Sequence, residues 1–67
     1  MTTFTIIEAQ NVNSVRDGVT VELSSLSAAK RYATKNQSFF GTALIIEVDG
    51  VRVAVKENGY NKKWINV

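Results

Sequence analysis

The segment from Ala43 to Lys56 constrains the fold more than any other part of this sequence. It holds two runs of branched and small apolar residues on either side of Asp49-Gly50, a dipeptide typical of two-residue β-turns. An unbroken ladder about this turn pairs Val48 with Val51, Ile46 with Val53 and Leu44 with Val55 on one face. On the other face it pairs Glu47 with Arg52, Ile45 with Ala54 and Ala43 with Lys56. The sequence therefore predicts a β-hairpin whose branched residues face the core.

The rest of the chain supplies the other elements of an α+β fold. Residues 4–9 are apolar and rich in β-formers, and apolar residues alternate with polar ones over 19–23, after an Asp17-Gly18 turn. A last strand is expected over 62–67. With a helix between the second and third strands, the order is ββαβββ. This order predicts one α-helix packed against a mostly antiparallel sheet of about five strands, in a single small domain of residues 1–67.

The helix is expected over 26–37. The serines before it supply N-cap oxygens for the free N–H groups of its first turn. Leu26, Ala29 and Ala33 form a narrow apolar stripe, and the small alanines allow the helix to lie close to the sheet.

Three cations lie on this helix. Arg31 and Lys35 fall opposite the stripe and Lys30 at its margin, and no acid stands three or four residues from Arg31 or Lys35. A solvated helix face explains the pattern, and the functional alternative is a basic ridge that grips phosphates or acidic side chains.

A second cationic patch is expected near the C-terminal strand. A four-residue turn over 58–61 pairs Val55 with Trp64 on the core face and Lys56 with Lys63 on the outer face. Like charges opposite each other are unfavourable, so with Lys62 they indicate a site for negative charge. The alternative is that edge lysines discourage aggregation.

The aromatic residues divide between core and surface. Trp64 and Phe4 are expected in the core rather than as stacking platforms. In Phe39-Phe40, strand alternation allows only one ring to point inward, so the other is open to a partner.

The chain contains no cysteine and no histidine. It therefore lacks disulfides, thiol nucleophiles, thiolate zinc sites and the commonest general base. It also lacks a phosphate-binding loop, a dinucleotide fingerprint and a nucleophile elbow. We expect no enzyme, no metal and no cofactor. No apolar run is long enough to span a membrane, no basic signal region begins the chain, and the lack of cysteine suits a reducing cytoplasm.

The net charge is +2, from eight Lys/Arg and six Asp/Glu, and no acid occurs between Glu22 and Glu47. This distribution argues against an acidic mimic of DNA. It favours a partner with a negative surface, either nucleic acid or a protein patch.

Five segments carry a resemblance to a known family: Glu8 to Ser14, Ser25 to Arg31, Phe40 to Thr42, Lys56 to Gly59 and Lys63-Trp64. They resemble the ninth group of phage-borne anti-CRISPR proteins that act on type I-F systems. The likeness extends over about residues 4–64 with nearly constant spacing, so it concerns the whole chain and not one short motif.

The resemblance implies a small sheet packed on one helix and a non-enzymatic inhibitor acting in the cytoplasm of the host bacterium. The family binds the guide-RNA-bearing backbone subunits of the type I-F surveillance (Csy) complex, blocks pairing of the guide with target DNA, and makes the inhibited complex hold double-stranded DNA without sequence preference. Carried over by position, the subunit contacts fall on Lys30, Arg31, Lys35 and Gln37, with Phe4 and Phe39 nearby. The duplex contacts fall on Lys56 and Lys63, beside Lys62.

Two alternatives remain: a small basic nucleic-acid-binding β-module, and a phage inhibitor of another host machine. The first predicts that the isolated protein binds DNA with an affinity that falls steeply with salt. The anti-CRISPR interpretation predicts weak or no DNA affinity until the Csy complex is present.

Overall fold

The computed structural model describes residues 2–11, 17–38, 41–59 and 63–67. Its elements are β1 (Thr2–Ala9), β2 (Val19–Leu23), α1 (Leu26–Lys35), β3 (Ala43–Val48), β4 (Val51–Lys56) and β5 (Trp64–Asn66). The order ββαβββ and the α+β class are those predicted from the sequence. No helix formed by the described residues is long and apolar enough to cross a bilayer.

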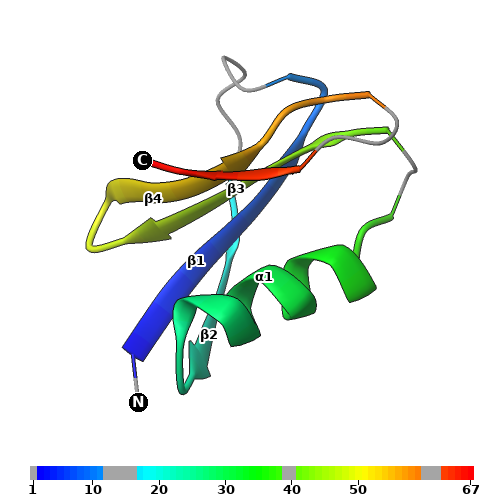
Figure 1. Cartoon of the computed structure of the whole chain (residues 1–67). Coiled ribbons are helices and arrows are strands. Elements are labelled where there is room, and N and C mark those ends of the chain that lie inside the picture. The colour runs from blue at the N-terminus through cyan, green and yellow to red at the C-terminus, as the bar shows by residue number, and fades with distance from the viewer. Residues whose placement is uncertain (1, 12–16, 39–40, 60–62) are drawn as a thin grey trace.

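The strands form one antiparallel sheet in the spatial order β2-β1-β3-β4-β5, and α1 lies across one of its faces (Figure 1). The central strand β3 is buried on both faces, since the consecutive residues Leu44, Ile45 and Ile46 are at most 1% exposed. The middle of the sheet is therefore the best-protected part of the fold.

Two apolar clusters lie on the two faces of the sheet. The main core lies between α1 and the sheet and consists of Phe4, Ile6, Ala29, Ala33, Leu44, Ile46 and Ala54. A smaller cluster on the other face consists of Ile7, Ala9 and Ile45, with Val55 packed against it. Because the buried residues of the helix, Ala29 and Ala33, carry only methyl groups, α1 can lie close to the sheet as the sequence predicted.

Side chains cap both ends of α1. The Ser25 hydroxyl accepts a hydrogen bond of 3.2 Å from the Ala28 backbone N–H, the usual N-cap contact. At the other end, Asn36 donates to the Tyr32 carbonyl from its backbone N–H at 3.0 Å and from its side-chain amide at 2.9 Å. The prediction that the helix continues to Gln37 is therefore wrong, because Asn36 already acts as the C-cap.

The hairpin turn has the predicted form. Asp49 and Gly50 have φ of +52° and +79°, as a type I′ turn requires at both central positions. The two pairs nearest the turn are also as predicted: Val48 with Val51 and Glu47 with Arg52.

Beyond these two pairs the hairpin departs from the predicted register. The ladder shifts between Ile46 and Glu47, where β4 contains Val53 as the extra residue of a β-bulge. The remaining pairs are therefore Ile46 with Ala54, Ile45 with Val55 and Leu44 with Lys56. The predicted unbroken ladder is wrong, because one inserted residue moves each later side chain to the opposite face. The change places the methyl group of Ala54 in the main core and moves Val55 to the smaller cluster.

The last strand is also shifted by one residue. Lys56 lies opposite Trp64 and Val55 opposite Ile65, so the predicted pairs of Val55 with Trp64 and of Lys56 with Lys63 are wrong. The connection between β4 and β5 is one residue longer than the predicted register allowed. The backbone N–H of Gly59 in this connection donates to the Gly41 carbonyl at 2.7 Å, which holds it against the segment before β3.

Candidate functional site

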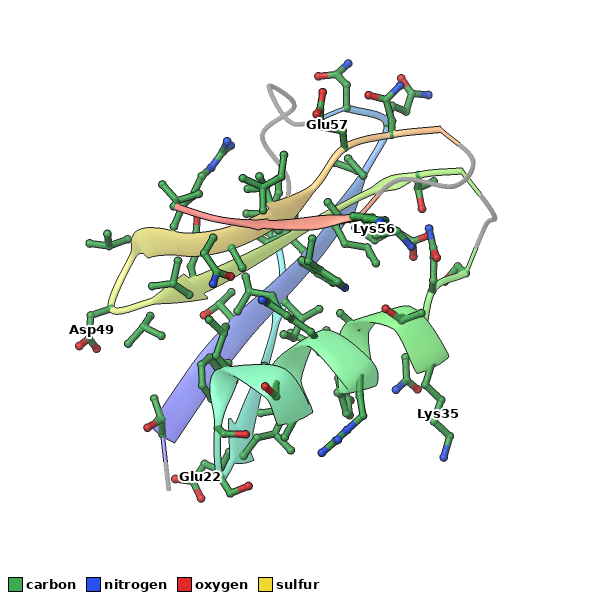
Figure 2. All side chains as sticks on the ribbon, viewed as in Figure 1. Glu22, Lys35, Asp49, Lys56 and Glu57 are labelled. Carbon is green, nitrogen blue, oxygen red and sulfur yellow. The ribbon has the colours of Figure 1, made fainter. Side chains whose placement is uncertain are left out.

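Lys30 lies on the flank of α1 that faces β5, whereas the side chain of Lys35 extends away from the sheet (Figure 2). Arg31 and Lys35 are exposed, whereas Lys30 is half-buried and its Nζ donates to Asn66 Oδ1 at 2.6 Å. Across residues 2–11, 17–38, 41–59 and 63–67, no hydrogen bond or ion pair involves the side chain of Arg31 or Lys35. These two charges are available to a partner, while Lys30 joins the helix to the last strand.

A groove of about 510 Å³ separates this flank from β5. Its lining residues are Lys30, Arg31, Thr34, Lys35 and Trp64. The indole of Trp64 is half-buried and packs against the main core, so the core fixes the aromatic wall of the groove. The groove is therefore lined by the aliphatic stems of the helix residues and by the indole, and not by the charged groups.

Lys56 lies on the same side of the sheet as this groove. It stands opposite Leu44 of the main core in one ladder and opposite Trp64 in the other. Figure 2 shows Lys56 on the helix side of the sheet and Glu57 on the other side. The hypothesis that Lys56 belongs to the outer face, apart from the helix cations, is therefore wrong, because the bulge at Val53 reverses its orientation.

The other residues of the predicted DNA patch lie near the start of β5. Lys63 is exposed and directly precedes Trp64, whereas Lys62 lies outside the described residues. Lys56 thus lies opposite Trp64 in the β4–β5 ladder, and Lys63 is its neighbour in the chain.

The aromatic and amide residues implied by the resemblance have different positions. Phe4 is 4% exposed and belongs to the main core, as its apolar strand indicated, so its ring offers little surface to a partner. Phe39 lies outside the described residues. Gln37 is half-buried, and its amide donates to Thr42 Oγ1 at 2.9 Å and to the Thr42 carbonyl at 3.2 Å.

Sequence reasoning missed the residue that organises this end of the helix. The Glu8 carboxylate accepts the Ser38 backbone N–H at 2.9 and 3.0 Å and the Thr42 hydroxyl at 2.6 Å. A single carboxylate on β1 therefore holds both ends of the connection between α1 and β3. The one available signal was an acid inside an otherwise apolar strand.

The opposite flank of α1 has a hollow with acidic character. It measures about 230 Å³, and its lining includes Glu8 and Asp17 together with Tyr32. The helix thus separates the groove beside β5 from an acidic hollow beside β1 and β2.

The chemical groups of this surface are charged and aromatic. No group of three or more potential metal ligands occurs within the described part of the chain, and the sequence has no histidine or cysteine. What the surface offers is a forked guanidinium, ammonium groups and an indole face, which suit acidic, phosphate-bearing or aromatic partners.

A comparison with solved structures finds related proteins. A solved structure named AcrIF9 superposes with a TM-score of 0.88 and shares 44% sequence identity, over 97% of this chain and 84% of that chain. No protein-family model matches the sequence, and a search of curated proteins finds no match. The likeness to the solved structure therefore extends over nearly the whole chain.

Proposed function

The chain belongs to the AcrIF9 family of anti-CRISPR proteins, inhibitors of type I-F systems, and we propose that it acts by occupying the path of target DNA on the Csy surveillance complex. The contact falls on the guide-RNA-bearing backbone subunits. Binding there is steric competition, since a folded domain in that path prevents the guide from pairing with its target.

The observation that carries this proposal is the pair of available cations on α1. Arg31 and Lys35 are exposed and lack partners within the described residues. A path that receives DNA is itself basic, so a basic inhibitor must find carboxylates, backbone carbonyls or guide phosphates along it. The forked donors of Arg31 and the point charge of Lys35 suit such acceptors, and Gln37 at the helix end adds an amide.

The proposal extends to duplex DNA held by the inhibited complex. Lys56 and Lys63 place positive charge around the start of β5, and Lys62 directly precedes Lys63 in the sequence. Contacts of this kind neutralise phosphates without reading bases, so the retention has no sequence preference and weakens as salt rises.

The protein acts without turnover and in the cytoplasm of the host bacterium, where the surveillance complex encounters target DNA. The absence of histidine and cysteine from the sequence supports a binding role over a catalytic one. A nuclease or hydrolase activity that co-purifies with the protein and disappears in a point variant would contradict this part of the proposal.

The test is retention of the protein on immobilised Csy complex, followed by a target-DNA binding assay. The wild type is expected to bind and to abolish guide-directed binding of target DNA. Arg31→Ala combined with Lys35→Ala should weaken retention at least tenfold. Arg52→Ala is the control for lost charge, because Arg52 lies opposite Glu47 near the hairpin turn and not on α1.

A different outcome of the same assays would favour the nucleic-acid-binding module. In that case the free protein binds duplex DNA tightly and with a steep salt dependence, and it is not retained by the Csy complex.

A further inference from the structure

The connection between β4 and β5 contains Asn58-Gly59, the one place in this sequence where asparagine directly precedes glycine. Asn58 is exposed, and among the described residues its side-chain amide has no hydrogen-bond partner. The exposed Asn36 and Asn66 differ in this respect, because the side-chain amide of each makes a hydrogen bond. The amide of Asn58 is therefore free to turn toward the main chain that follows it.

We propose that Asn58 is a site of spontaneous deamidation and that the fold restrains this reaction through the backbone N–H of Gly59. In the reaction, the Gly59 nitrogen loses its proton and attacks Asn58 Cγ. A bond forms between these two atoms, the Cγ–Nδ2 bond breaks, and Nδ2 takes up a proton and leaves as ammonia. Water then opens the cyclic imide at one of its two carbonyl carbons, which gives either aspartate or isoaspartate at this position.

The glycine makes this asparagine more reactive than the others that the structure describes. A side chain on the attacking residue crowds its nitrogen, and Gly59 has none. Its φ of +122° also lies in a region that side-chain-bearing residues rarely adopt. The residues after Asn36 and Asn66 are glutamine and valine, whose side chains hinder the same attack. These two asparagines are therefore internal controls for the reactivity of Asn58.

The restraint comes from the hydrogen bond of 2.7 Å that the Gly59 N–H donates to the Gly41 carbonyl. While this bond is made, the nitrogen keeps its proton and is held toward Gly41. The reaction therefore requires local opening of the connection. Gly41 lies between Ser38 and Thr42, which both donate to the Glu8 carboxylate. Glu8 thus steadies the segment that carries the acceptor, and loosening that segment should speed the reaction.

Deamidation changes both the charge and the length of the connection. Either product replaces a neutral amide with a carboxylate, so the net charge falls from +2 to +1. Isoaspartate also routes the main chain through Cβ, which lengthens the path between β4 and β5. The new carboxylate stands two residues after Lys56. It should therefore weaken the retention of duplex DNA, a consequence that rests on the proposed function.

The experiment follows the free protein over time in mildly alkaline buffer, with and without enough guanidinium chloride to unfold it. Ion exchange separates the product by its lower charge, and mass spectrometry of peptides assigns the converted residue. In the unfolded chain Asn58 should convert before Asn36 and Asn66. In the folded protein it should convert at least about tenfold more slowly than in the unfolded chain, because the reaction waits for local opening.

Variants test the restraint within the folded protein. Glu8→Gln should speed conversion of Asn58 severalfold, because it loosens the segment that carries the Gly41 carbonyl. Glu22→Gln removes the same charge at an exposed position of β2 and should leave the rate unchanged. Asn58→Gln should abolish the early product, since its longer side chain does not form the same five-membered ring. Thermal melts verify that each variant is folded.

Two results would overturn the inference: conversion of Asn36 or Asn66 as fast as Asn58 in the unfolded chain, and equal rates at Asn58 in the folded and unfolded protein. The consequence for DNA is tested with Asn58→Asp, which should retain duplex DNA on the Csy complex severalfold less well than Asn58→Gln. Equal retention by these two variants would contradict that consequence. The deamidation rates need no complex, so failure of the proposed function would leave them unchanged.

Discussion

The Thr42 hydroxyl donates a hydrogen bond of 2.6 Å to the Glu8 carboxylate, which ties the residue before β3 to β1. The same carboxylate accepts the backbone N–H of Ser38, just after the helix, through both oxygens. The Gln37 amide in turn donates to Thr42 Oγ1. One carboxylate thus fixes the connection that follows the cationic helix, and with it the position of Gln37.

We expect Glu8→Gln to loosen this connection without unfolding the domain. The substitution keeps the size of the side chain, but it removes the charge and turns one of the two oxygens that accept the Ser38 N–H into a donor, so the contacts that remain are weaker. Hydrogen bonds to a charged group contribute about 1.5–3 kcal/mol, and a loss of about 1–2 kcal/mol in the free energy of unfolding should appear in urea melts. Retention on the Csy complex should fall severalfold. Glu57→Gln, at an exposed position, is the control, and equal stability of the two variants would argue against the role of Glu8.

The bulge in β4 predicts a specific order of damage when aspartate is introduced. Ala54 is 0% exposed and lies opposite Ile46 in the main core, so Ala54→Asp should cost several kcal/mol and prevent cooperative folding. Val53→Asp should be less damaging, because position 53 is half-buried and the carboxylate of the new aspartate can reach water. Val51, at 65% exposure, is the control, and its substitution should change stability by about 0.5 kcal/mol or less. If Val53→Asp were the most damaging of the three, the unbroken ladder would be correct and the bulge wrong.

The element order followed from patterns that are local in the sequence. A type I′ turn needs positive φ at both central positions, and Asp49 and Gly50 adopt it. This turn sets the two residue pairs beside it. Ser25 and the alanine stripe likewise fix the start and the buried face of the helix. Each of these depends on a few neighbouring residues, so the sequence alone was enough to predict them.

The features that sequence reasoning missed depend on contacts between distant segments. Nothing in the alternation of β4 marks Val53 as an extra residue, because Val51, Val53 and Val55 suit an unbroken strand equally well. The bulge places Ala54 in the main core opposite Ile46, among residues that come from distant segments. The bulge also puts Lys56 on the helix side of the sheet. The prediction that Lys56 lies on the face away from the helix cations therefore failed together with the predicted register. Glu8 was missed for a similar reason, since its partners lie about thirty residues away.

Gly18 provides a test of how closely the segment before β2 approaches β1. A Cβ at this position would lie 2.7 Å from the Ile6 carbonyl oxygen and 2.7 Å from Ile7 Cγ1. Because one of these neighbours is backbone, the contact cannot be relieved by a rotamer change alone, and Gly18→Ala should destabilise the domain by about 1–3 kcal/mol. Gly50→Ala is the comparison: it meets no atom within 4 Å and suffers only from its positive φ, so it should cost about 1–2 kcal/mol. Urea melts in which Gly18→Ala matches the wild type would show that β1 and this segment are further apart.

The last prediction concerns the division of work between the two sets of cations. Arg31 and Lys35 lie on the helix, whereas Lys56 lies opposite Trp64 in the β4–β5 ladder and Lys63 directly precedes Trp64. Alanine at Arg31 and Lys35 should weaken binding to the Csy complex at least tenfold and restore cleavage of target DNA. Alanine at Lys56 and Lys63 should chiefly reduce retention of duplex DNA and lower its salt slope by about one unit for each lost phosphate contact.

Because Lys56 shares the helix side of the sheet, the second pair is also expected to weaken complex binding slightly, by less than threefold. This small coupling would be absent if Lys56 lay on the outer face. Arg31, Lys35 and Lys63 are exposed, so their loss should change the free energy of unfolding by about 0.5 kcal/mol or less, and thermal melts separate lost binding from lost folding. If alanine at Lys56 and Lys63 abolished complex binding while alanine at Arg31 and Lys35 left it unchanged, the two sets would have the opposite roles.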